Sequence, residues 1–155
     1  MLSVIINSEL LRHKSTATSC EVSVLWLRNR FPGNALLHWV IFVKPAHVTL
    51  GTRHDVATQP PGIKWTYSSI PNYKMDAEER FLGYMALGSV KDGAAFENII
   101  KEVEVPKLKE SCQDWVRKVV EEAVKAELLP ESALSQLAKV PTRPQTEGTQ
   151  RVINP

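Results

Sequence analysis

A cysteine at the predicted start of a helix is the first residue that could carry chemistry. Ser111 precedes Cys112, and Asp114 lies three residues after Ser111, which is the spacing of an N-terminal capping box with Asp in place of Glu. Cys112 would then occupy the first helical position, where unsatisfied backbone N–H groups and the helix dipole stabilise a thiolate. A nucleophilic cysteine needs this environment. A buried structural thiol is the competing interpretation, because cysteine is among the residue types most often buried.

Two histidines could supply the base for such a thiol. His38 lies in the apolar run LLHWVIFV (36–43), and His54 lies in the next predicted strand. Each could be a core histidine satisfied by a hydrogen bond, because an unpaired buried imidazole is costly. Together with Cys112 they fit the nucleophile, base and orienting group of a thiol enzyme. A zinc site formed by the same three side chains is a weaker alternative, because no closely spaced ligand pair supports it.

The elements that must position these side chains fall into two groups. β-Branched and apolar runs predict strands over residues 21–27, 36–43, 49–58, 63–68 and 80–90. Residues 71–79 predict a turn, and Gly83 indicates a bulge in the last strand. Helical spacing then predicts helices over 94–103, capped by Asp92, over 111–128 and over 131–140. Strands first and helices afterwards predict an α+β fold, with an antiparallel sheet of four to five strands followed by two to three helices.

The length and composition predict one folded domain with flexible ends. The 155 residues are enough for a single core, and 43% apolar with 23% charged residues is ordinary globular usage, which excludes a wholly disordered chain. We expect a flexible leader over 1–20, one α+β domain over 21–140 and a disordered tail over 141–155, where few side chains can be buried.

Charge and cysteine content exclude several classes of protein. A formal net charge of +2 does not favour nucleic-acid binding, and no apolar stretch approaches the length of a membrane span. Two cysteines, Cys20 and Cys112, are too few for a disulfide scaffold, so a reduced, cytoplasmic protein is expected. Glycine-rich phosphate loops, a GxSxG elbow and an HExxH helix are absent from the sequence, and no cofactor or metal is expected.

Three short motifs occur in a telling order: HWVIFV (38–43), RHDVA (53–57) and SCQDWV (111–116). Together they resemble the circularly permuted branch of the NlpC-type, papain-like thiol enzymes, which includes the lecithin retinol acyltransferase group and the small phospholipase/acyltransferases. The pattern is also similar to small uncharacterised fungal proteins with HW, GT-x-x-H and CQ-x-W signatures. The resemblance covers about residues 36–128 and implies a permuted papain-like core. Ser111 stands where an asparagine commonly precedes the nucleophile.

The resemblance also implies roles for individual residues. Cys112 would be the nucleophile, His38 the general base, and His54 the group that orients His38. Asp55 competes with His54 for the orienting role, because adjacent strand residues point to opposite faces of the sheet. The backbone N–H of Cys112 would be one oxyanion donor, and no second donor is assigned.

The expected function is therefore that of a thiol-dependent hydrolase or acyl/amide transferase. It would act on a small-molecule or peptide acyl substrate through a thioester. Two alternatives stay open: a non-catalytic protein-interaction module on the same scaffold, and a small-molecule cyclase or isomerase that uses the same pocket.

Overall fold

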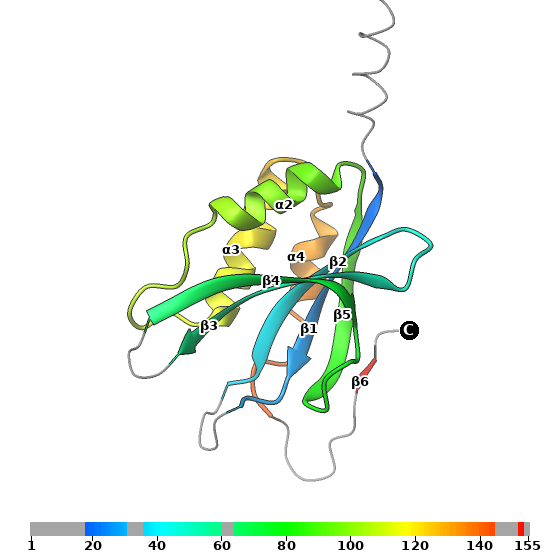
Figure 1. Cartoon of the computed structure of the whole chain (residues 1–155). Coiled ribbons are helices and arrows are strands. Elements are labelled where there is room, and N and C mark those ends of the chain that lie inside the picture. The colour runs from blue at the N-terminus through cyan, green and yellow to red at the C-terminus, as the bar shows by residue number, and fades with distance from the viewer. Residues whose placement is uncertain (1–17, 31–35, 60–63, 145–151, 154–155) are drawn as a thin grey trace, which may run out of the picture.

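The fold is an antiparallel sheet followed by three helices, as the sequence predicts (Figure 1). The computed structural model describes residues 18–30, 36–59, 64–144 and 152–153. The strands are β1 (Cys20–Leu27), β2 (His38–Pro45), β3 (Leu50–Gln59), β4 (Lys64–Lys74), β5 (Phe81–Val90) and the short β6 (Val152–Ile153). The helices are α2 (Gly93–Glu102), α3 (Cys112–Lys125) and α4 (Ser132–Leu137). The strand order is β4-β3-β2-β1-β5-β6, and among these described strands only β6 lies parallel to its neighbour.

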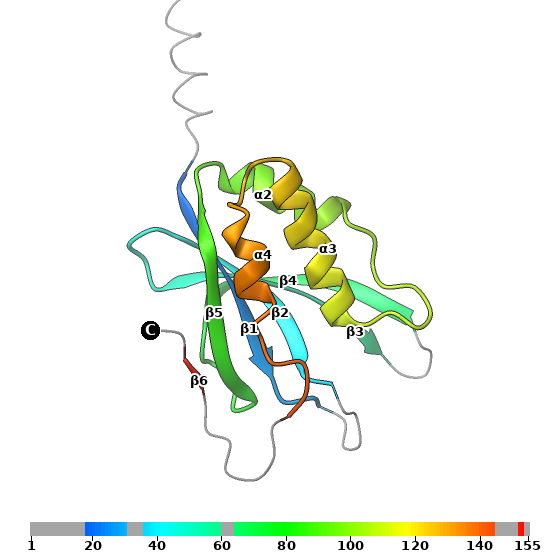
Figure 2. The same ribbon diagram turned by 180° about the vertical axis from the view of Figure 1, so that it is seen from behind.

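The two central strands are buried on both faces, which explains their nearly continuous apolar sequences. Alternate residues of β1 and β2, including Val24, Trp39 and Ile41, pack against α2, α3 and α4, which all cover one face of the sheet (Figure 2). The intervening residues, including Leu25 and Phe42, form a second cluster with Tyr73 of β4 and Phe81 of β5. Both faces of β2 are therefore fixed by packing, and this holds its first residue, His38, in place.

The ends of the helices follow local capping rules. Asp92 caps α2 by accepting a hydrogen bond from the backbone N–H of Ala95. Ser111 caps α3, and its side chain and that of Asp114 form the predicted reciprocal capping box. Cys112 is therefore the first residue of α3, as the sequence predicts. None of the helices in the described part of the chain is long and apolar enough to cross a membrane.

The prediction of a turn over 71–79 is wrong for its first four residues, because β4 continues to Lys74. β4 is the edge strand of the sheet, where the missing N–H of Pro71 is tolerated. The ladder with β3 is irregular at this point, and Asn72 adopts a positive φ of 52°.

The predicted bulge in β5 is present, since the register of the pairing between β1 and β5 shifts between Gly83 and Phe81.

The ends of the chain are only partly described. Residues 1–17 of the expected leader lie outside the described residues, and Cys20 already belongs to β1. The expectation of a disordered tail is corrected for two places. The carbonyl groups of Pro141 and Thr142 accept hydrogen bonds from the body of the domain, and β6 pairs with Gly83 and Tyr84 of β5. Backbone hydrogen bonds hold these residues in place, and hydropathy does not reveal such bonds.

Candidate active site

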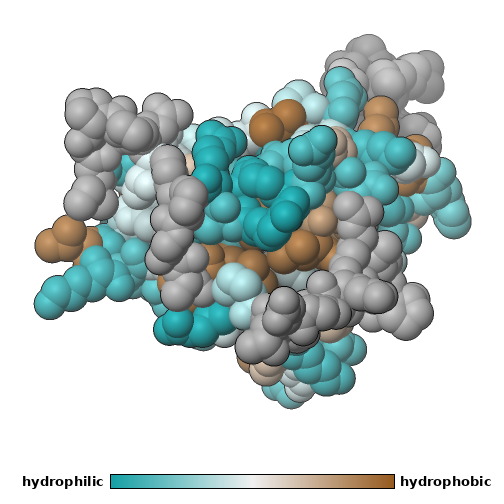
Figure 3. Space-filling model, turned by 90° about the horizontal axis from the view of Figure 1, so that it is seen from below, coloured by the Kyte–Doolittle hydropathy of each residue, from teal (hydrophilic) through white to brown (hydrophobic). Residues whose placement is uncertain are grey.

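One end of the sheet holds a pocket of about 540 Å³. The pocket is lined by the segment after β1, the start of β2, the end of β3, residue Trp65 of β4, Arg80 before β5, and the start of α3. Viewed from this end, apolar surface lies among strongly polar side chains (Figure 3). Cys112 and His38, which the sequence predicts as nucleophile and base, both line this pocket.

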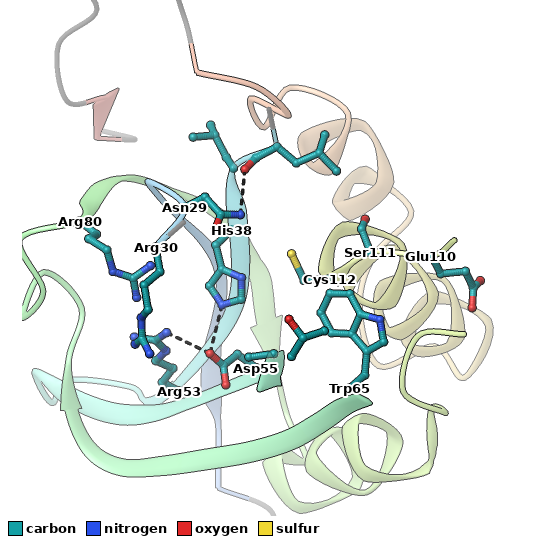
Figure 4. Close-up of a pocket in the computed structure, with 14 residues that line it drawn as sticks. Asn29, Arg30, His38, Arg53, Asp55, Trp65, Arg80, Glu110, Ser111 and Cys112 are labelled. Carbon is teal, nitrogen blue, oxygen red and sulfur yellow. Dashed lines mark hydrogen bonds and ion pairs between the residues drawn. The ribbon is translucent and has the colours of Figure 1, made fainter. Parts of the chain in front are cut away.

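Cys112, His38 and Asp55 lie side by side across the pocket, with the His38 imidazole between the sulfur and the carboxylate (Figure 4). The Nε2 atom of His38 is 3.2 Å from Oδ2 of Asp55. The other side of the ring faces Cys112, whose side chain interacts closely enough with His38 to shift its pKa. The His38 side chain is 13% exposed, so the pair is sheltered but reachable from the pocket. The arrangement is that of a thiol, a base and an orienting carboxylate.

The Asp55 carboxylate is held by three donors. Besides His38, it accepts hydrogen bonds from Nη2 of Arg53 at 2.9 Å and from Oγ of Ser68 at 2.8 Å. Arg53 is itself buried and also binds Tyr73 and Glu78. A carboxylate with this many donors has a fixed orientation, and it passes that orientation to the imidazole.

These contacts set the charge of the site. Burial lowers the pKa of His38, but the hydrogen bond to Asp55 and the interaction with Cys112 outweigh it and raise the pKa to about 9. Burial raises the pKa of Asp55, but His38 and Arg53 together hold it well below its usual range. At neutral pH the site therefore contains an imidazolium bound to a carboxylate, next to the side chain of Cys112.

A buried amide joins the helix start to the strand start. Nε2 of Gln113 donates to the carbonyl of Leu37 at 2.9 Å and to the carbonyl of Thr142 at 2.8 Å. The same Thr142 carbonyl accepts from the backbone N–H of Leu37 at 2.9 Å. Gln113 follows Cys112 and Leu37 precedes His38, so these bonds fix the thiol relative to the imidazole. We call the three residues Leu37, Gln113 and Thr142 the amide clip.

His54 does not reach the site, and the prediction that it orients His38 is corrected. Its Nδ1 atom lies 2.8 Å from the hydroxyl of Tyr67, and its Nε2 atom is buried without a partner among the described residues. His54 faces the helices, while Asp55 faces His38, as the alternation along β3 requires. A zinc site of Cys112, His38 and His54 is thereby excluded, and no group of three potential ligands is placed to hold a metal among the residues that the structure describes.

Several residues of the site were not predicted from the sequence. Arg53 carries a weak local signal, because it lies two residues before Asp55 and therefore shares its face of the strand. Ser68 and Thr142 carry none, since their contacts depend on pairing with distant segments. Of the tryptophans, Trp26, Trp39 and Trp115 are buried core residues, and Trp65 lines the pocket.

A known family matches residues 26–130, which is more than half of the chain and includes Cys112, His38 and Asp55. The chain belongs to DUF6540, a family of unknown function. No curated protein and no solved structure matches the chain significantly. Membership of DUF6540 therefore does not identify the chemistry of the pocket, and the geometry of the pocket is the guide to that chemistry. Thr142 of the amide clip lies beyond the matched residues.

The amide clip predicts a coupled loss of stability and of site geometry in Gln113→Ala. The substitution leaves the buried Leu37 carbonyl without its side-chain donor, so we expect the free energy of unfolding to fall by about 1–3 kcal/mol. The contact with Cys112 should also loosen, and the pKa of His38 should then fall. Urea denaturation and NMR titration of the His38 ring protons measure the two effects. Gln136→Ala, the same change in α4, should alter neither, and an unchanged His38 pKa in Gln113→Ala would contradict the role of the clip.

His54 predicts a loss of stability in acid. Burial and, to a lesser extent, the positive charge of Lys101 lower its pKa to about 4, although Asp55 opposes the shift. The unfolded chain therefore binds more protons than the folded one between pH 6.5 and 4, so the His54 contribution to stability decreases as the pH falls through this range. The free energy of unfolding of wild type minus that of His54→Gln should decrease by up to about 3 kcal/mol over these pH units. His38, with its raised pKa, acts in the opposite sense above pH 6.5, and the subtraction removes it. A difference that does not vary with pH would show that His54 titrates normally.

Proposed function

We propose that this member of DUF6540 is a thiol-dependent hydrolase or acyl/amide transferase that acts through a thioester on Cys112. One observation carries the proposal: the His38 imidazole lies between the Cys112 thiol and the Asp55 carboxylate in a single pocket. The three side chains come from a helix start and two strands, and each is fixed by buried contacts. A structural core histidine has no need of both partners. The circularly permuted papain-like enzymes that the sequence resembles use the same order of groups.

The reaction would begin with the imidazolium already formed. Because His38 already carries its proton, the Cys112 thiol gives its own proton to water, and the thiolate then attacks the acyl carbon and forms a tetrahedral intermediate. His38 then gives its proton to the leaving group as the acyl–oxygen or acyl–nitrogen bond breaks, and a thioester with Cys112 remains. Neutral His38 next takes a proton from water or another acceptor, whose oxygen or nitrogen attacks the thioester and releases the thiolate. Asp55 is a positioning residue, because it holds the ring and stabilises its charge.

The negative oxygen of the tetrahedral intermediate needs donors. The backbone N–H of Cys112, at the first position of α3, has no acceptor among the described residues and is the donor we assign. Gln113 cannot be the second donor, because its amide is committed to two carbonyl groups.

A thiol nucleophile also requires reducing surroundings, and both cysteines are free, so we propose that the activity is cytoplasmic.

The non-catalytic alternative makes different contacts. An interaction module on this scaffold would have histidines bonded to the backbone, whereas His38 binds the Asp55 carboxylate and His54 binds the Tyr67 hydroxyl. Cys112 is 6% exposed, which suits a structural thiol, but its pocket location offers a route to it that a core position lacks. Acylation of Cys112 therefore distinguishes the two readings.

The nucleophile predicts a selective acylation. On incubation with p-nitrophenyl acetate, the wild-type protein should release p-nitrophenolate and carry an acetyl group on Cys112, which peptide mass spectrometry detects. Cys112→Ala should do neither while keeping its thermal stability within about 2–3 °C of wild type, since the side-chain change is small. Cys20→Ala is the matched control and should react as wild type. Iodoacetamide should label Cys112 faster than Cys20 at pH 6–7, and equal slow labelling of both thiols would refute a nucleophilic Cys112.

Asp55 predicts a shift in the pH profile of acylation. With an alkyl ester or amide substrate, whose leaving group needs the proton of His38, the rate should decline as the pH rises through about 9, the pKa of His38. Asp55→Asn removes the carboxylate that raises this pKa, so the declining limb should move down by about one to two pH units. Ser68→Ala removes a hydrogen bond to Asp55 but keeps its charge, and it should leave the limb near its wild-type position. A limb at the same pH in Asp55→Asn would show that another group controls it.

A further inference from the structure

Three arginines gather on one wall of the pocket. Arg30 follows β1, Arg53 belongs to β3, and Arg80 precedes β5, so three separate segments bring these cations to the same side of His38 (Figure 4). The opposite wall carries Glu110, whose carboxylate is 2.6 Å from Nζ of Lys118. We call Arg30, Arg53 and Arg80 the arginine wall.

The carboxylates near the arginine wall do not balance its charge. Asp55 binds both Arg53 and His38, and Glu78 binds both Arg53 and Arg80. Two carboxylates therefore face three guanidinium groups and an imidazolium. Even a thiolate on Cys112 leaves one positive charge in excess. Among the described residues, Arg30 has no ion-pair partner.

Excess cationic charge in a partly enclosed pocket favours an anion. We propose that the arginine wall binds a carboxylate or phosphate group of the substrate, so that the enzyme selects acyl substrates that carry a negative charge near the bond they lose. Guanidinium groups bind both kinds of anion through paired N–H donors, and low-dielectric walls strengthen the attraction. Arg53 is buried and committed to Asp55, so Arg30, which is exposed, and Arg80, which is partly exposed, are the groups that meet the anion.

This inference depends on the proposed function for its meaning, but its test does not need the natural substrate. Iodoacetate and iodoacetamide alkylate thiols by the same displacement of iodide and differ in charge. The ratio of their second-order rate constants at Cys112, read by peptide mass spectrometry, reports attraction of an anion to the pocket. We expect this ratio to exceed the ratio for glutathione at the same pH, and to fall on addition of salt, which screens the attraction.

Variants separate the arginine wall from the charge of His38, which also attracts iodoacetate. Arg30→Gln and Arg80→Gln should each lower the ratio by about two- to five-fold, because each removes one positive charge from the pocket that Cys112 lines. Lys125→Gln, the same change of charge at the far end of α3, should leave the ratio unaltered. Arg80 also binds the backbone of Arg28, so Arg30→Gln, which replaces an exposed side chain, carries the test if Arg80→Gln does not fold.

A direct titration covers the case in which Cys112 reacts with neither reagent. Inorganic phosphate or acetate should shift the NMR signals of the Trp65 side chain, which lines the pocket, and Arg30→Gln should weaken this binding by a similar factor. The phosphate and acetate arms distinguish the two anions. Slow reaction of Cys112 with iodoacetamide would count against the nucleophile and leave the arginine wall standing. A ratio unchanged in both arginine variants, with no shift of Trp65 by either anion, would overturn the wall as an anion site.

Discussion

The geometry of the pocket depends on one buried amide. A thiol from a helix and an imidazole from a strand meet only if the first turn of α3 is held against the first residue of β2, and Gln113 makes that connection through the Leu37 carbonyl. The bond lies one residue from Cys112 and one residue from His38, so very little backbone between the bond and these two side chains can bend. Packing of α3 on the sheet sets the distance between the layers, while the amide sets where the helix stops along the strand.

The second constraint is a chain of charges that runs from the thiol into the sheet. His38 contacts Asp55, Asp55 contacts Arg53, and Arg53 contacts Glu78. Each partner in this chain makes its neighbour less costly to bury, because a buried ion is tolerated when it is paired and hydrogen-bonded. The site is therefore supported by this chain of ion pairs on one side and by the apolar helix layer on the other.

The sequence was informative where local rules apply. The capping box of Ser111, the apolar stripe of α3 and the strand runs of β1 and β2 depend on neighbours within a few residues, so the fold class and the position of Cys112 were predictable. The choice between His54 and Asp55 was not, since it depends on which face of β3 the helices cover. The contacts of Arg53, Gln113 and Ser68 were also out of reach, because each joins segments far apart in the chain. The predicted strand ended too early because Pro71 was taken as its end. A proline is tolerated in an edge strand, and the sequence alone does not show which strand lies at the edge of the sheet.

The contact with residues 141–142 has an evolutionary meaning. Pro141 and Thr142 contribute main-chain oxygens, to Trp39 and to the amide clip, so any amino acid with the same backbone path could replace them. A segment that acts through its peptide groups leaves no signature in residue identity. The family match stops at residue 130, well before this segment, even though the catalytic geometry we propose relies on it. Boundaries drawn from amino-acid likeness can thus exclude part of the machinery that they are meant to enclose.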